Sequence, residues 1–306
     1  MSPVSMEQRI ARGLRLALLS SVAWTFWTVL IDVVDSMDKQ DYVLYLLIVE
    51  TFVLLFSAPL VLYRRRTVGR GRRAGGKVGR YPLYAGACFG VGNIVFYGLV
   101  GGANYPFVAS MMFSNVIVLS LLLGKITSQR LGVLYVLGTL LATAGLVAQA
   151  MALYGADIAV GMQIAAYSAV MAIAYAVGYY FAISYAYAGR DQVAALPSVY
   201  APILAVALAY GLLSGNLASA TMPTQLEVAI CLLIAASVVV GYFSEQYAFL
   251  VLKGARVKYL NMANVFTNLE IVGAIAYTAL VIGLSYQWLM VGLVLTAIGV
   301  IVIAWS

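Results

Sequence analysis

Apolar runs of about 20 residues, each ended by charged residues or by glycine and proline, follow one another along the chain. A run of this length, wound into an α-helix, is long enough to cross the hydrocarbon core of a bilayer. Soluble domains carry far more charge than this sequence, in which 64% of the residues are hydrophobic and 9% are charged. We therefore predict an all-α, multi-pass membrane protein. The ten transmembrane helices that we predict cover residues 13–31, 42–63, 81–101, 104–124, 130–150, 160–186, 195–214, 226–252, 257–283 and 286–305.

The basic residues predict how these helices are oriented, because Lys and Arg concentrate in short cytoplasmic loops. If the N-terminus lies inside, every Lys and Arg except Lys39 falls on the cytoplasmic side. The longest basic stretch, residues 64–80, is interpreted as a solvated anchor that touches anionic lipid headgroups, and not as a nucleic-acid site. We expect both termini to be cytoplasmic and the chain to lie in the cytoplasmic membrane.

The two halves of the chain share a weak similarity at a nearly fixed spacing. The segments that match at a shift of 153 or 154 residues are "FSN" (113–115) with "FTN" (266–268), Gly138 with Gly292, and Gly145 with Gly299. Each half carries five predicted helices, and an odd number reverses the direction in which the second half enters the membrane. After a cytoplasmic N-terminus at 1–12, we therefore expect two inverted five-helix repeats, residues 13–150 and 158–306.

A family resemblance accompanies this repeat. The segment "NVIVLSLLLGKITSQRLGVLYVLGTLLATAGLV" (115–147) resembles the end of the first half in the drug/metabolite transporter (DMT) superfamily, EamA type, where "LLLGE" ends the fourth span. Here Lys125 replaces the acid, so no role of that glutamate carries over. The segment 254–302 resembles the second copy, again without the "GE". The resemblance implies a ten-helix carrier whose central cavity is lined by the first four spans of each half, with the fifth and tenth spans at the periphery.

Motifs for enzyme chemistry are missing from the sequence. It contains no histidine and no G-x-S-x-G, H-E-x-x-H or P-loop pattern. Cys88 and Cys231 lie in apolar runs, where a thiol usually behaves as a small hydrophobic side chain. We therefore expect no enzyme activity, no metal site and no cofactor.

Three glutamates, Glu50, Glu245 and Glu270, lie within predicted spans. Placing an acid at the centre of a membrane helix costs about 2.5–3.5 kcal/mol on insertion scales, so such a residue usually faces a cavity or takes up a proton. On a helical wheel Glu270 shares a face with Asn264 and Thr267, and we prefer these three as cavity lining. Two interpretations of the acids stand side by side: coupling to protons or cations, or a hydrogen bond to a neighbouring helix.

Aromatic and polar side chains share faces on several other predicted helices. The further candidates for a binding cavity are Trp24 and Trp27, Asn93, Tyr175 and Tyr179, and Tyr242 and Phe249. Each face alone is explained by packing, but together they predict a cavity of aromatic faces and carboxylates. Such a lining suits organic cations, amines or aromatic amino acids. We interpret the aligned Asn115 and Asn268 as interhelical hydrogen-bonding residues, with the cavity wall as the alternative.

These observations predict a secondary transporter that moves a small metabolite, such as an amino acid, an amine or an organic cation, by alternating access. Export is an expectation that comes from the family resemblance, and proton coupling is a further hypothesis. The alternatives are an uptake permease or a lipid-linked sugar flippase of the same fold, and a non-transporting membrane scaffold. The expected partners are the bilayer, a small-molecule substrate and protons, but not nucleic acid. One chain holds both halves, so a monomer suffices.

Overall fold

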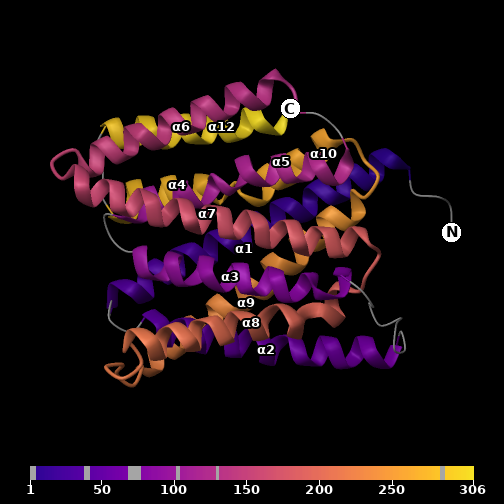
Figure 1. The fold of residues 1–306 in the computed structure, drawn as a ribbon, viewed down its shortest axis with the longest axis horizontal. Helices are drawn as coiled ribbons and strands as arrows, with labels where there is room; N and C mark the ends of the chain where they lie inside the picture. The colour runs from indigo at the N-terminus through magenta and orange to yellow at the C-terminus, as the bar shows by residue number, and fades with distance from the viewer. Residues whose placement is uncertain (1–4, 38–41, 68–76, 101–103, 129–130, 283–286) are drawn as a thin grey trace.

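A computed structural model describes residues 5–37, 42–67, 77–100, 104–128, 131–282 and 287–306. Over these residues the chain is helical and contains no strand, which confirms the all-α prediction. The helices lie side by side along one direction of the bundle (Figure 1). They are α1 (Met6–Met37), α2 (Tyr42–Thr67), η2 (Lys77–Arg80), α3 (Tyr81–Leu99), α4 (Tyr105–Phe113), α5 (Asn115–Thr127), α6 (Val133–Tyr154), α7 (Ile158–Tyr187), α8 (Gln192–Ser214), α9 (Gln225–Val251), α10 (Val257–Thr267), α11 (Glu270–Tyr277), η4 (Thr278–Ile282) and α12 (Gln287–Ala304).

Within the described ranges, nine helical segments are long and apolar enough to cross a membrane. They correspond to nine of the ten predicted spans. Many of their large apolar side chains face outward, among them Val133, Val136 and Leu140 on α6. Outward apolar faces of this extent are unusual on a soluble protein and are expected against lipid. The described helices therefore have the construction of a multi-pass membrane protein.

The start of α1 lies earlier than the apolar run predicts. Ser5 and Gln8 form a reciprocal cap, in which each backbone N–H donates to the other side chain at 3.2 Å. Residues 6–12, which were predicted to belong to the cytoplasmic N-terminus, are thus helical and form the first turns of α1. Arg9, in these turns, donates to the carbonyl oxygens of Val251 at 2.9 Å and Lys253 at 3.0 Å, and so ties α1 to the end of α9.

The prediction of one continuous helix over residues 257–283 is wrong. It is divided into α10, α11 and the π-helical turn η4. The Thr267 hydroxyl and the Asn268 amide both donate to the carbonyl of Asn264, at 2.8 and 2.6 Å. These side chains compete for the acceptor that the next turn of a regular helix would use, and the helix ends there.

The corresponding predicted helix in the first half, 104–124, is also divided, into α4 and α5. At the junction the Ser114 hydroxyl donates to the carbonyl of Met111 at 2.6 Å. Ser114 keeps near-helical angles, so α4 and α5 together still form one membrane-length segment. In both halves, therefore, an interruption lies next to an asparagine that the sequence repeat aligns, Asn115 in one case and Asn268 in the other.

Helices α6 and α12 pack against each other along one edge of the bundle (Figure 1). Their contact rests on glycines: a Cβ added to Gly138 would lie 2.6 Å from the carbonyl oxygen of Gly299, and one added to Gly145 would lie 2.6 Å from that of Gly292. Small residues of this kind let membrane helices approach backbone to backbone. This pair leaves the middle of the bundle to the other helices.

Candidate functional site

A cavity lies in the middle of the bundle; about 600 Å³ around it is free of protein atoms, and this figure includes space open to the surroundings. Its wall comes from α1 to α5 and from α7 to α10, whereas α6 and α12 contribute no described residue to it. The residues that line it are Trp24, Trp27, Glu50, Phe89, Asn93, Met112, Asn115, Tyr175, Tyr179, Tyr200, Ile203, Val238, Tyr242, Glu245, Thr267 and Asn268. Among these lining residues there is no Lys or Arg.

Aromatic rings form much of the cavity wall, and they contact one another. The rings of Trp24 and Trp27 meet edge to face at 5.4 Å between centroids, and Trp27 stacks on the buried Phe96 at 4.9 Å. Tyr200 and Tyr242 meet edge to face at 5.9 Å. Each ring thus has a neighbour that restricts its orientation.

Glycines on neighbouring helices make room for these rings. A Cβ added to Gly241 on α9 would lie 3.0 Å from the ring of Trp24, and one on Gly92 of α3 would lie 3.1 Å from Tyr175. Both distances are shorter than ordinary van der Waals contacts. The glycines therefore set how deeply the two rings seat, and hence the width of the cavity.

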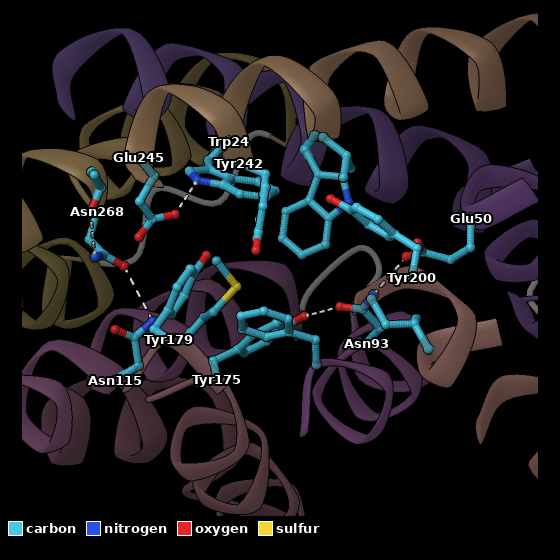
Figure 2. Close-up of a pocket in the computed structure, with 16 residues that line it drawn as sticks. Trp24, Glu50, Asn93, Asn115, Tyr175, Tyr179, Tyr200, Tyr242, Glu245 and Asn268 are labelled. Carbon is cyan, nitrogen blue, oxygen red and sulfur yellow. Dashed lines mark hydrogen bonds between the residues drawn. The ribbon is translucent and has the colours of Figure 1, made fainter. Parts of the chain in front are cut away.

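Glu50 marks one end of the cavity. It lies on α2 between the buried Val49 and Val53 and is only 2% exposed. The Asn93 amide of α3 donates to its Oε1 at 2.9 Å, and the Tyr175 hydroxyl of α7 donates to the Asn93 carbonyl at 2.7 Å (Figure 2). The other carboxyl oxygen, Oε2, receives no hydrogen bond from any described residue. Glu50 is therefore held on one side and has an unused acceptor on the other.

Glu245 on α9 marks the other end and is 1% exposed. The indole N–H of Trp24 donates to its Oε2 at 3.3 Å, and the Tyr179 hydroxyl also hydrogen-bonds to the carboxyl group. Figure 2 shows Glu245 beside the Trp24 indole, on the side of the cavity where Asn268 lies. This carboxyl is thus positioned by α1 and α7.

An asparagine pair joins the two interrupted segments. The Asn115 amide donates to the Asn268 carbonyl at 3.3 Å (Figure 2). Both side chains also line the cavity, so the interhelical hydrogen bond and the cavity wall, weighed as alternatives from the sequence, occur together. The Asn115 Oδ1 atom receives no hydrogen bond from the described residues.

Most of the candidates predicted from the sequence lie in the cavity wall. They are Trp24, Trp27, Glu50, Asn93, Tyr175, Tyr179, Tyr242, Glu245 and Thr267. Asn264 does not line the cavity but donates to the Val116 carbonyl at 3.5 Å and to the Ser120 hydroxyl at 3.4 Å. Phe249 is fully buried in a separate apolar cluster.

The predicted face of Asn264, Thr267 and Glu270 assumed a continuous helix. Because the helix is interrupted at Asn268, a wheel with constant steps does not apply across that point, and Thr267 and Asn268 reach the cavity instead. The backbone of Glu270 begins α11, but its side chain lies outside the described residues.

Asp32 is a buried polar residue that lies just outside the predicted span 13–31 and was not among the predicted site residues. It lies on α1 instead, and its Oδ2 accepts a hydrogen bond from the Tyr277 hydroxyl at 2.8 Å. The ring of Tyr277 contacts that of Tyr105 at 5.2 Å, and the Tyr105 hydroxyl donates to Thr28 at 3.3 Å. The i, i+4 spacing of Trp24, Thr28 and Asp32 along one face could have revealed it.

Tyr200 was also missed, because it stands among 22 tyrosines and nothing in its neighbourhood along the chain distinguishes it. Its position in the wall depends on how α8 packs beside α2 and α3, which is tertiary information. In the described part of the chain, no group of three or more Cys, Asp or Glu residues could hold a metal ion.

Comparisons with known proteins add information on the fold. No protein-family model matches the sequence, and no curated protein matches it. Nine solved chains match the structure. One of them, described only as "Crystal structure of protein", has a TM-score of 0.64 and 14% sequence identity, and the match covers 97% of each chain. At this identity the likeness concerns the overall fold alone.

Proposed function

We propose that the chain is a secondary carrier that moves a small organic cation or amine across the cytoplasmic membrane by alternating access. The observation that carries the proposal is the cavity, which combines aromatic faces with two buried carboxyl groups and has no basic residue in its described lining. Aromatic faces and carboxylates both attract cations, and more strongly where water is excluded. A buried acid without a cationic partner in an apolar layer commonly marks a substrate or ion pathway.

Contacts between the halves support an inverted repeat. The sequence similarity pairs Gly138 with Gly292 and Gly145 with Gly299, and the contacts are crossed: Gly138 meets Gly299, and Gly145 meets Gly292. A two-fold axis produces this crossed pattern, because each residue then meets the counterpart of its neighbour. Asn115 bonds to its own counterpart, Asn268, as expected for residues on the axis.

The antiparallel course of α6 and α12 supports an axis in the membrane plane, as in carriers that open alternately to each side. The first four helical segments of each half supply the cavity lining, whereas the fifth and tenth do not. This is the arrangement that the resemblance to the drug/metabolite transporter superfamily implies. We propose membership of that superfamily, and export as its direction.

The ends of the helices support the proposed topology. Arg9 near the start of α1, Lys253 after α9 and the chain end at Ser306 lie at one end of the bundle, since Arg9 bonds to the Lys253 carbonyl and Asn261 of α10 donates to Ser306 at 3.2 Å. Figure 1 shows the start of α1 and the end of α12 on this side. Basic residues and termini at one end fit a cytoplasmic position for both.

Two alternatives fit the cavity less well. A non-transporting scaffold has no use for an unpartnered buried acceptor, and Glu50 Oε2 is one. A carrier for an anionic, lipid-linked sugar needs positive charge near its substrate, and the described lining has none. For the same reason we favour an amine over an amino acid, whose carboxylate would lie among acids.

The proposal is tested with purified protein in liposomes and a panel of radiolabelled amines and quaternary ammonium ions. We expect uptake that saturates, and a loss of at least tenfold in Glu245→Gln, because a charge-assisted contact is replaced by a neutral one. Glu7→Gln, an exposed acid at the start of α1, is the matched control and retains uptake. If no organic cation is taken up, or if Glu245→Gln behaves like the control, the proposal is wrong.

A further inference from the structure

The two buried carboxyl groups lie on opposite sides of one cavity. Figure 2 shows Glu245 on one side and Glu50 with Asn93 on the other, with aromatic rings in the space between them. Tyr200 lines the same cavity and lies within electrostatic range of both carboxyls. Because Glu245 comes from α9 and Glu50 from α2, the separation is set by the packing of the bundle.

Each carboxyl has its own set of donors. Trp24 and Tyr179 bond to Glu245, whereas Asn93 bonds to Glu50, and the two sets share no residue. Two acids that bound one small ion together would converge on it. Glu50 and Glu245 are therefore separate binding points, and aromatic rings line the cavity that they share.

The binding point at Glu50 is incomplete. Its Oε2 atom is buried and receives no hydrogen bond from the described residues. A buried acceptor without a donor is costly, and a ligand N–H group at this position would satisfy it. Among the described lining residues there is no Lys or Arg that could take this role.

The charges of Glu50 and Glu245 determine which class of ligand can neutralise both carboxylates. A ligand with one positive charge compensates only one of the two carboxylates, and the other acid then has to stay protonated, because an uncompensated buried charge is strongly unfavourable. A ligand with a positive group at each end compensates both. Tyr175, Tyr200 and Tyr242 also line this cavity, and the apolar surfaces of their rings suit methylene groups.

We propose that the substrate is a linear diamine or polyamine, with one ammonium group bound to Glu245, another to Glu50, and the alkyl chain against the tyrosine rings. This inference rests on the proposed function, a carrier for organic cations. It assigns the carboxyls separate roles at the two ends of one ligand. The carrier then selects substrates by the distance between their charges.

The test is a binding series on the purified full-length protein, with α,ω-diamines of increasing length and monoamines with the same number of carbons, measured by calorimetry. We expect one optimal diamine length, and at that length binding at least tenfold tighter than for the matched monoamine. The series needs no mutation, so a variant that fails to fold does not affect it.

Glu50→Asp makes the test sharper, because it keeps the charge but draws it back by one methylene group. We expect the optimum to move to a longer diamine, which a purely structural role of Glu50 would not produce. Glu50→Gln should lower diamine affinity to that of the monoamine, and Glu7→Gln should leave the whole series unchanged.

The outcomes separate this inference from the proposed function. Diamines that bind no better than monoamines, or affinities that do not depend on diamine length, overturn the inference. If singly charged cations are still transported in the liposome assay described for the proposed function, the carrier function stands. If neither class of amine binds and no cation is transported, both fail. Tighter binding of zwitterionic amino acids than of diamines also overturns the inference.

Discussion

The position of Glu50 depends on a short chain of polar residues. Tyr175 donates to Asn93, and Asn93 donates to Glu50, so α7, α3 and α2 are linked through side chains in an otherwise apolar region. In a low-dielectric interior such a chain is strong when it is complete and costly when one member is removed. The carboxyl therefore points into the cavity because two other helices hold it there.

Removing members of this chain should have graded effects on stability. Tyr175→Phe loses one hydrogen bond, at about 1 kcal/mol in the free energy of unfolding, whereas Asn93→Ala also leaves Glu50 Oε1 without a donor and should cost about 1–3 kcal/mol. Thermal unfolding in detergent measures both. Tyr167→Phe on the outward face of α7 is the control and should unfold like the wild type. A larger loss of stability for Tyr175→Phe than for Asn93→Ala would contradict the proposed series of hydrogen bonds from Tyr175 through Asn93 to Glu50.

At the scale of helices, hydropathy predicts where a span lies but not whether it is continuous. The apolar run over 257–283 has the same composition whether or not the helix is interrupted. The interruption comes from Thr267 and Asn268, whose side chains donate to the Asn264 carbonyl. The start of α1 was missed for a similar reason, since the cap of Ser5 and Gln8 lies outside the apolar run.

A lining residue could be predicted where a polar side chain stands within an apolar run of the sequence. Glu50 and Glu245 stand out as acids in apolar runs, and both line the cavity. Asn264 stands out equally, yet it is satisfied by α5 and lies outside the wall. Which side a polar residue faces depends on packing between helices, and a wheel drawn on one helix does not contain that information.

Glycine contact between α6 and α12 leads to a prediction at this scale. In Gly138→Ala the new methyl would lie 2.6 Å from the Gly299 carbonyl oxygen and 2.7 Å from Ile303, so the helices must separate. We expect a loss of about 1–3 kcal/mol in the free energy of unfolding. Amine affinity should stay unchanged, because neither helix lines the cavity.

The matched control is Gly132→Ala, at the N-cap of the same helix, where an added methyl meets nothing within 4 Å. Its effect should stay below about 1 kcal/mol, the typical cost of placing alanine at an N-cap. Thermal unfolding of the two variants side by side makes the comparison. Equal stability of the two would mean that the close backbone contact does not hold the halves together.

For the whole molecule, the first prediction concerns orientation. Ala156, before α7, and Ala188, after it, are exposed and lie at opposite ends of that helix. In a background with alanine at Cys88 and Cys231, Ala156→Cys should react with a membrane-impermeant maleimide added outside intact cells. Ala188→Cys should react only after the inner face is made accessible. The reverse pattern would invert the proposed topology.

Helix α1 is fastened to the second half of the chain at both of its ends. Arg9 bonds to the backbone at the end of α9, and Asp32 accepts the hydroxyl of Tyr277 on α11. The two tryptophans of the cavity wall lie between these links. If the halves rock against each other, the two links cannot both persist, and each is a contact that closes one side of the cavity.

Tyr277→Phe removes the hydrogen bond to Asp32, which closes the cavity on the proposed outer side. The variant should therefore favour the state in which the cavity is open to the outside. A cysteine in the wall, Val238→Cys, in the same background without native cysteines, should then react faster with an impermeant maleimide added outside. If the hydrogen bond to Asp32 contributes about 1.4 kcal/mol, the open population, and with it the rate, rises about tenfold.

The opposite link gives the matched comparison. Arg9→Gln weakens the contact between α1 and α9 that closes the cavity on the proposed cytoplasmic side. It should therefore shift the population toward the state that is open to the cytoplasm, and so slow labelling of Val238→Cys from outside. Tyr247→Phe, a tyrosine exposed on α9, should leave the rate unchanged. Opposite effects of the two link variants are expected only if the links compete. Parallel effects would mean that each variant merely loosens the bundle, and the rocking of the two halves would lose its support.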